Sequence, residues 1–177
     1  IGPLVTACIL PSIVEGLAEV DARIQFRTGN NATLYSLAAQ GGIDFFIGGA
    51  PEGSDYYSTV NSLKFQRTGT NPATLAIFIR PGHPLLQTGL APEHLIQFPV
   101  ACDSFVRERL GSTRLSEFGF QAPKIEMDDY HTLADLATST DFIIVGDPIA
   151  RHLGPVRDMV MLQSELFDEI RPWRWGV

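Results

Sequence analysis

Hydrophobic residues in the first twenty positions recur at helical spacing. After a brief strand-like start at Ile1, Thr6 is predicted to cap a helix whose apolar face consists of Ile9, Leu10, Ile13, Val14, Leu17 and Val20. Pro11 interrupts this face. Because proline lacks the N–H of a helical turn and clashes with the preceding turn, we expect a kink there, or a helix that restarts with Pro11 in its first turn.

Strand and helix patterns then alternate. Residues 24–27 alternate apolar and polar side chains, as in a half-buried strand. A helix is predicted over residues 32–40, with Asn30 and Asn31 as good capping residues before it. Residues 43–47 form a short apolar run, which is typical of a buried parallel strand. The first fifty residues therefore predict a β-α-β-α-β order.

A looser stretch over residues 53–73 is rich in Ser, Thr, Asn and Gly, with one strand candidate at residues 62–66. The alternating pattern then resumes, with a short helix that starts at Pro92. The remaining elements that the pattern predicts are strands at residues 75–79, 100–102, 124–127, 142–145, 160–162 and 170–173, and helices at residues 105–118 and 131–138.

Two consecutive α/β patterns without a sequence repeat predict an α/β protein of two lobes, each with a mostly parallel sheet. We assign residues 1–72 to the first lobe and residues 73–158 to the second. Residues 159–177 are expected to return to the first lobe, so that two crossover strands join the lobes and let them hinge. The chain ends without a closing helix, and we expect this end to be truncated.

Composition excludes several classes of protein. The chain has 177 residues, of which 45% are hydrophobic and 19% charged, so it can bury a sizeable core and is not disordered. Its net charge is −7, and its basic residues are scattered, which argues against direct nucleic-acid binding. No apolar run approaches the roughly 20 residues of a membrane span. The chain opens without a signal sequence, so a cytoplasmic protein, or a fragment of one, is expected, with no membrane partner. A mature secreted chain would have the same start and is the alternative.

Signatures of catalysis and metal binding are missing from the sequence. There is no GxSxG elbow, P-loop or GxGxxG motif, and the four histidines show no metal-ligand spacing. Asp128 and Asp129 precede a predicted helix and are expected to cap it. Cys8 and Cys102 are too far apart in sequence for a zinc motif; ordinary buried thiols are expected, with a redox switch as the alternative. The sequence predicts no enzyme, no metal and no cofactor.

The carboxyl ends of strands are where open α/β sheets bind ligands. This rule selects six segments, residues 3–6, 29–31, 48–50, 103–105, 128–131 and 146–148. Several of them carry small hydroxyl or amide side chains that suit a polar or anionic ligand, namely Thr6, Asn30, Asn31 and Ser104. The alternative is that these four residues only cap helices.

Four motifs, in this order and spacing, carry a resemblance to a known family. They are Ile1-Gly2 followed by Leu10-Pro11, the GIDFFIG run at residues 42–48, the RPGHPL run at residues 80–85, and the TDFIIV run at residues 140–145. The chain resembles the effector-binding (regulatory) domain of LysR-type transcriptional regulators. The resemblance implies a type 2 periplasmic-binding-protein fold, with two Rossmann-like lobes and a small-molecule effector in the interlobe cleft. It also implies that DNA is bound only through an N-terminal winged helix-turn-helix domain, which this chain lacks.

The resemblance also implies a set of effector contacts. They fall on Leu4, Val5, Thr6, Asn30, Gly48, Gly49, Asp103, Ser104, Phe105 and Tyr130. The family's GxG turn is replaced by Ser139-Thr140-Asp141, so the correspondence is weakest in that loop. The resemblance places His83 in a turn, which it is expected to shape, and gives Asp44 a structural role.

We therefore expect a ligand-sensing regulatory domain that forms a homodimer or homotetramer. Helix N-termini and hydroxyl groups favour a small organic acid as the effector, and Phe105 and Tyr130 would tolerate an aromatic one. A solute-binding protein of an uptake system has the same fold and is the alternative function. An enzyme on this scaffold would need a pair of reactive side chains, which the sequence does not show.

Overall fold

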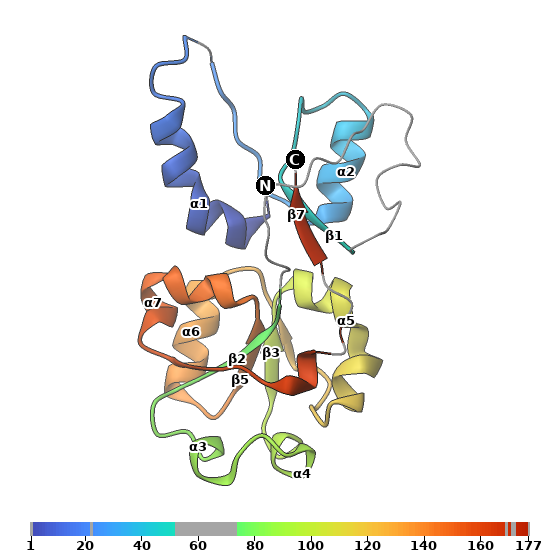
Figure 1. Ribbon diagram of the computed structural model, residues 1–177, viewed down its shortest axis with the longest axis vertical. Helices are drawn as coiled ribbons and strands as arrows, with labels where there is room; N and C mark the ends of the chain where they lie inside the picture. The colour runs from blue at the N-terminus through green and yellow to red at the C-terminus, as the bar shows by residue number, and fades with distance from the viewer. Residues whose placement is uncertain (1, 22, 52–73, 169, 171–172, 177) are drawn as a thin grey trace. The chain divides into compact units, whose positions relative to one another are not determined.

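The computed structural model describes residues 2–21, 23–51, 74–168, 170 and 173–176 (Figure 1). The chain forms two compact units. The first unit comprises Ile1–Ala73 and Ile170–Val177, and the second comprises Thr74–Glu169. The chain therefore passes from one unit to the other twice.

A five-stranded sheet forms the centre of the second unit. Its strands lie in the order β4 (Ile125–Glu126), β3 (Val100–Cys102), β5 (Ile143–Gly146), β2 (Ala76–Ile79) and β6 (Val160–Leu162). β3 runs parallel to both β4 and β5, whereas β2 is antiparallel to both β5 and β6. Four of the five strands thus point the same way, so the sheet is mostly parallel.

Helices of the second unit connect these strands. They are α3 (Leu85–Thr88), α4 (Pro92–Leu95), α5 (Ser104–Glu117), α6 (Tyr130–Ser139), α7 (Gly154–Arg157) and the 3₁₀ helices η1 (Pro148–His152) and η2 (Glu165–Phe167). The predicted helices at residues 105–118 and 131–138 correspond to α5 and α6. α5 is interrupted at Gly111, where φ is 65°, a left-handed conformation that glycine adopts at little cost.

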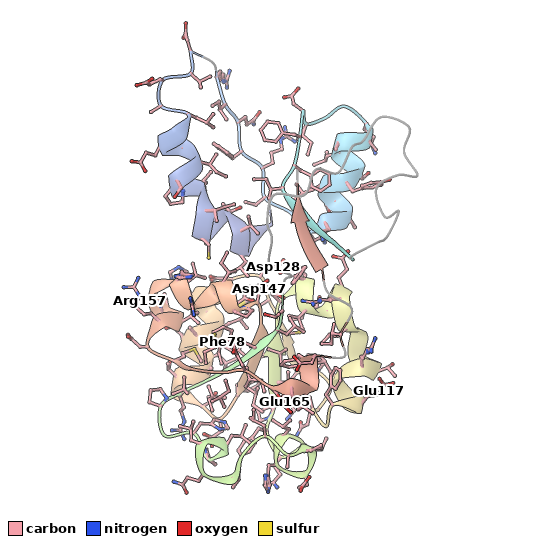
Figure 2. All side chains as sticks on the ribbon, in the orientation of Figure 1. Phe78, Glu117, Asp128, Asp147, Arg157 and Glu165 are labelled. Atoms are coloured by element: carbon pink, nitrogen blue, oxygen red, sulfur yellow. The ribbon has the colours of Figure 1, made fainter. Side chains whose placement is uncertain are left out.

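The core of the second unit is built on the central strands. Every residue of β2, β3 and β5 is buried. Phe78 of β2 has no exposed surface, and Figure 2 shows it in the middle of the unit. Continuous apolar runs on these strands fit a sheet that is covered on both faces.

The first unit is built differently. Its elements are α1 (Pro3–Gly16), α2 (Asn31–Ala39), β1 (Gly48–Pro51) and β7 (Trp173–Gly176). β1 pairs with β7 in antiparallel fashion, with Gly49 opposite Trp175. The prediction of a mostly parallel sheet is therefore wrong for the described part of this unit.

Two predicted strands of the first unit are not strands in the structure. Residues 24–27 and 43–47 form no strand, and the strand that follows begins at Gly48. Ile24, Phe26 and Phe45 are all exposed. A parallel strand needs neighbours for its hydrogen bonds, and an alternating sequence cannot show whether such neighbours are present. The strand candidate at residues 62–66 lies outside the described residues.

The return to the first unit also starts later than predicted. Residues 160–162 form β6, which pairs with β2 in the second unit, so their assignment to the first lobe is wrong. The strand predicted at residues 170–173 is β7, which begins at Trp173. Pro11 lies inside α1, and a single helix spans it, starting at Pro3 instead of Thr6.

Candidate functional site

Asp103 follows β3 directly and begins the helix α5. One carboxylate oxygen accepts a hydrogen bond from the backbone N–H of Val106 at 2.7 Å, and the other accepts one from the Tyr130 hydroxyl at 2.7 Å. Only 3% of Asp103 is exposed. Burial raises the pKa of this carboxyl to about 6, although the two hydrogen bonds oppose the shift. The sequence placed Asp103 at the site because of its position after a strand.

Tyr130 opens α6 and is buried beneath the end of β5. A Cβ atom on Gly146 would lie 2.7 Å from the Tyr130 hydroxyl, so only glycine fits at this position without displacing the ring. Burial raises the pKa of Tyr130 well above its usual value, and the Asp103 carboxylate adds to the shift. The hydroxyl therefore stays protonated and can donate to Asp103.

Two more carboxylates lie at this end of the sheet. Asp128, two residues after β4, accepts a hydrogen bond from the backbone N–H of Ser104 at 2.9 Å. Asp147 follows β5 directly, and its Oδ1 accepts from the backbone N–H of Ile149 at 2.9 Å. Figure 2 shows Asp128 and Asp147 at the same edge of the second unit, away from Phe78. β3, β4 and β5 are adjacent and parallel, which brings the residues after them together.

Asp147 differs from the other two carboxylates. Its Oδ2 is buried and has no hydrogen-bond partner among the described residues. Burial raises the pKa of Asp147, and attraction to the Arg109 guanidinium opposes this shift. Residues 146–148 were among the segments that the strand-end rule selected, but the sequence offered no reason to prefer Asp147 within them.

Arg109 contributes a positive charge to the same region. Its Nη1 donates to the backbone carbonyl of Thr74 at 3.3 Å, and its guanidinium lies 5.9 Å from the centre of the Phe105 ring. Burial lowers the pKa of Arg109 to about 10, so it is still charged at neutral pH. Arg109 was not predicted as a site residue, because it does not directly follow a predicted strand.

The predicted contacts in the first unit fall into two groups. Leu4 and Val5 are buried in the first turn of α1, where the Thr6 hydroxyl donates to the Gly2 carbonyl at 2.9 Å. Gly2 is the N-cap residue of this helix, so the predicted capping role of Thr6 is wrong.

The second group joins α2 to β1. Asn30 caps α2 by accepting from the backbone N–H of Thr33 at 2.9 Å. Asn31 is buried, and its side-chain amide donates to the Gly49 carbonyl at 3.2 Å. A Cβ atom on Gly48 would lie 2.9 Å from Oδ1 of Asn31. The structure therefore brings Asn30, Gly48 and Gly49 together through Asn31.

The comparisons with known proteins identify the family. A family model, LysR substrate binding domain, matches residues 1–161. The chain belongs to this family. The regulatory domain of OxyR2 from Vibrio vulnificus in its reduced form is a similar solved structure, with 11% identity, a TM-score of 0.72, and coverage of 99% of this chain and 81% of that one.

Two further solved structures are similar. The cofactor-binding domain of the Cbl transcriptional regulator has 14% identity and a TM-score of 0.71, with 99% of this chain and 77% of that one covered. The regulatory domain of MexT, a transcriptional activator in Pseudomonas aeruginosa, has 17% identity and a TM-score of 0.64, with 99% and 84% covered. Among curated protein sequences, none matches the chain. The fold of this LysR substrate-binding domain is thus the predicted type 2 periplasmic-binding-protein-like α/β fold.

The contacts of the cysteines and of the Asp128-Asp129 pair in this LysR domain bear on the roles that the sequence predicted for them. Burial raises the pKa of Cys102 to about 12, so it is not the thiolate that a redox switch requires. Cys8 and Cys102 form no disulfide. Asp129 accepts from the backbone N–H of His131 at 3.0 Å and so caps α6, as predicted, whereas Asp128 bonds to α5.

His83 shapes a turn, as the resemblance implied. It is 1% exposed, its Nδ1 accepts from the Leu85 N–H at 3.1 Å, and its Nε2 lies 3.2 Å from the Asp141 carbonyl. Nε2 is therefore the protonated nitrogen of the neutral ring. Burial lowers the pKa of His83, which favours that neutral form.

Metal sites and membrane spans are absent from the described part of the chain. No group of three or more His, Cys, Asp or Glu side chains there could hold a metal ion. None of the described helices is long and apolar enough to cross a membrane. A cavity of about 510 Å³ lies between residues 23–27 and 42–47 of the first unit, and it contains none of the predicted effector contacts.

Proposed function

We propose that this chain senses a small-molecule effector, which binds at the carboxyl end of the sheet in the second unit. The observation that carries the proposal is the group of buried polar side chains there, formed by Asp103, Tyr130 and Asp147. Buried carboxylates destabilise a fold unless they are hydrogen-bonded, and perturbed carboxylates gather at functional sites. Membership of a family named for substrate binding supports the same conclusion.

The proposed contacts in the second unit are Asp103, Ser104, Phe105 and Tyr130. In the first unit, Asn30, Gly48 and Gly49 are proposed contacts that Asn31 holds together. Leu4 and Val5 have buried side chains, so they and Thr6 would offer a ligand mainly the backbone of the first turn of α1.

The sensing domain is proposed to act within a longer transcription regulator that forms a homodimer or homotetramer and binds DNA through a separate N-terminal domain. MexT, one of the similar solved structures, is described as a transcriptional activator. Effector binding would change the arrangement of subunits only as far as the effector binds one arrangement more tightly than the other.

A ligand screen with a site variant tests this proposal. Metabolites are screened for those that raise the melting temperature of the 177-residue chain, and their affinity is measured by calorimetry. Tyr130→Phe removes the hydroxyl that holds Asp103 and is expected to weaken binding by roughly tenfold, the effect of one lost hydrogen bond.

Thr88→Ala, at an exposed position of α3, is the control and should bind like the wild type. If no metabolite stabilises the chain, the sensing function is wrong. Equal affinity in Tyr130→Phe and the wild type would place the site elsewhere.

A further inference from the structure

We propose that the second unit recognises a protonated amino group of its ligand, which is held by Asp147 next to Asp103 and Asp128. This inference rests on the proposed function, because it names the chemical class of the ligand bound at the same site. It replaces the small organic acid that the sequence favoured.

Three amide groups at the ends of these strands are already bonded to carboxylates. The sequence favoured an anion because helix N-termini present free N–H groups. In the structure, the N–H of Ser104 donates to Asp128, that of Val106 donates to Asp103, and that of Ile149 donates to Asp147. A ligand carboxylate would have to displace the protein's own carboxylates to bind there.

Asp147 offers a carboxylate oxygen that accepts no hydrogen bond within the described chain. Only 5% of the residue is exposed, and its Oδ2 is buried without a hydrogen-bond partner among the described residues. Buried carboxylate oxygens normally have a donor, since an unmade hydrogen bond of this kind is costly. An ammonium group has three N–H donors and no acceptor, so it supplies what Oδ2 lacks.

The charges around Asp147 favour a cation as well. Asp103 and Asp128 follow the neighbouring parallel strands β3 and β4, and both Asp147 and Asp128 act electrostatically on Asp103. The cation that acts on Asp147 is Arg109, whose Nη1 donates to the Thr74 carbonyl. Among the described residues, these three carboxylates and one guanidinium leave an excess of negative charge, which attracts an ammonium group and repels a fourth carboxylate.

The remaining groups position this acceptor. The Tyr130 hydroxyl donates to Asp103 and lies against Gly146, the residue before Asp147. The short 3₁₀ helix η1 then begins with Pro148, and the Ile149 N–H holds Oδ1 of Asp147. Because the Ile149 N–H holds Oδ1, the orientation of Oδ2 is fixed. Oδ2 can therefore select a ligand that places a hydrogen-bond donor in that direction.

Three probes of equal length test the inference. Butylammonium, butyrate and butanol are titrated into the ¹⁵N-labelled 177-residue chain at constant ionic strength, and amide signals of Ser104, Gly146 and Ile149 are followed. Butylammonium should shift these signals in a saturable way, and butyrate should not. Asp147→Asn should weaken butylammonium binding at least tenfold, and Asp128→Asn about threefold. Asp158→Asn, which makes the same charge change at an exposed position, should leave binding unchanged.

Several results would overturn the inference. Butyrate shifting the signals in place of butylammonium would restore the organic acid and leave the sensing function intact. Equal shifts from all three probes would show apolar contact only. Unchanged butylammonium binding in a folded Asp147→Asn variant would mean that the Asp147 carboxylate interacts with Arg109 and not with the ligand. If that variant fails to fold, unchanged binding in Asp128→Asn would reject the inference. If none of the three probes shifts the amide signals, the ammonium site is also rejected. The metabolite screen separately tests whether the chain binds any effector.

Discussion

The two units of this chain have similar sequence patterns and different structures. In the second unit, apolar runs at residues 76–79, 100–102 and 143–146 form adjacent strands whose residues are all buried. In the first unit, residues 24–27 alternate apolar and polar side chains and residues 43–47 are a short apolar run, both of which also predict strands. Neither segment forms a strand, and Phe45 is 68% exposed. A strand pattern therefore indicates a segment that can extend, and paired neighbours decide whether it becomes part of a sheet.

The largest expected effect concerns the cores of the two units. Phe78→Ala, at a residue with no exposed surface, should lower the free energy of unfolding of the second unit by about 3–5 kcal/mol, because it removes a buried ring and leaves a cavity. Phe45→Ala should change the stability of the first unit by less than about 0.5 kcal/mol, since surface substitutions have small effects.

Urea unfolding separates the two cases. Both tryptophans of the chain lie in β7 of the first unit, so their fluorescence reports that unit, while far-UV circular dichroism reports both. A loss of more than about 2 kcal/mol in Phe45→Ala, on the scale of core substitutions, would show that residues 43–47 are packed and would remove the contrast between the units.

The next effect concerns the buried carboxylate of the second unit. The pKa of Asp103 is about 6 in the folded chain and 3.8 in its unfolded reference, so the folded state holds the proton more tightly. The associated stability is fully present below pH 3.8 and is lost as the pH rises through 6. Asp103→Asn cannot ionise, and its stability relative to the wild type should therefore increase by about 3 kcal/mol between pH 3.5 and pH 7.

Thermal or urea unfolding across this pH range measures the difference between variant and wild type. That difference removes the contribution of His83, whose lowered pKa affects both proteins alike. It reports Asp103 together with its electrostatic coupling to Asp128 and Asp147. Asp135→Asn, on the exposed side of α6, is the matched control for the loss of one carboxylate. A parallel pH profile for Asp103→Asn and the wild type would mean that Asp103 is not buried in this way.

The smallest expected effect concerns the link between α2 and β1 in the first unit. Asn31→Ala removes the hydrogen bond to the Gly49 carbonyl and should lower the stability of this unit by about 1 kcal/mol. Asn30→Ser keeps an oxygen acceptor at the N-cap and should stay within about 0.5 kcal/mol of the wild type. Tryptophan fluorescence during urea unfolding measures both, and equal stabilities for Asn31→Ala and the wild type would show that the link is not stabilising.

Local signals account for the parts of the fold that were predicted correctly. Asn30 before an apolar helical face predicted α2, and the strand at residues 100–102 was predicted with its bounds. The same reasoning failed at Gly111, where α5 is interrupted, because a glycine within a helical pattern does not reveal its φ angle. β6 was placed in the wrong unit, because its three residues do not indicate which strand they pair with.

The candidate site also contains residues that local sequence signals predicted and residues that they did not. Position after a strand was enough to select Asp103 and Ser104 from the sequence, and the residues around Tyr130 followed from the same rule. Asp147 was not singled out, since its importance arises from a buried carboxylate oxygen without a hydrogen-bond donor. Arg109 was not singled out either, since its importance arises from its attraction to the Asp147 carboxylate. Neither property exists until residues that are distant in sequence are packed together.

The sequence by itself determined that this chain is an α/β protein, where most of its second unit's strands and helices lie, and which family it resembles. These depend on hydrophobic period, capping residues and short motifs, all of which are local. Only the tertiary structure decided which extended segments pair, and which strand-end amides already have partners. Pairing and burial depend on contacts between distant parts of the chain, and those contacts changed the expected ligand from an anion to a cation.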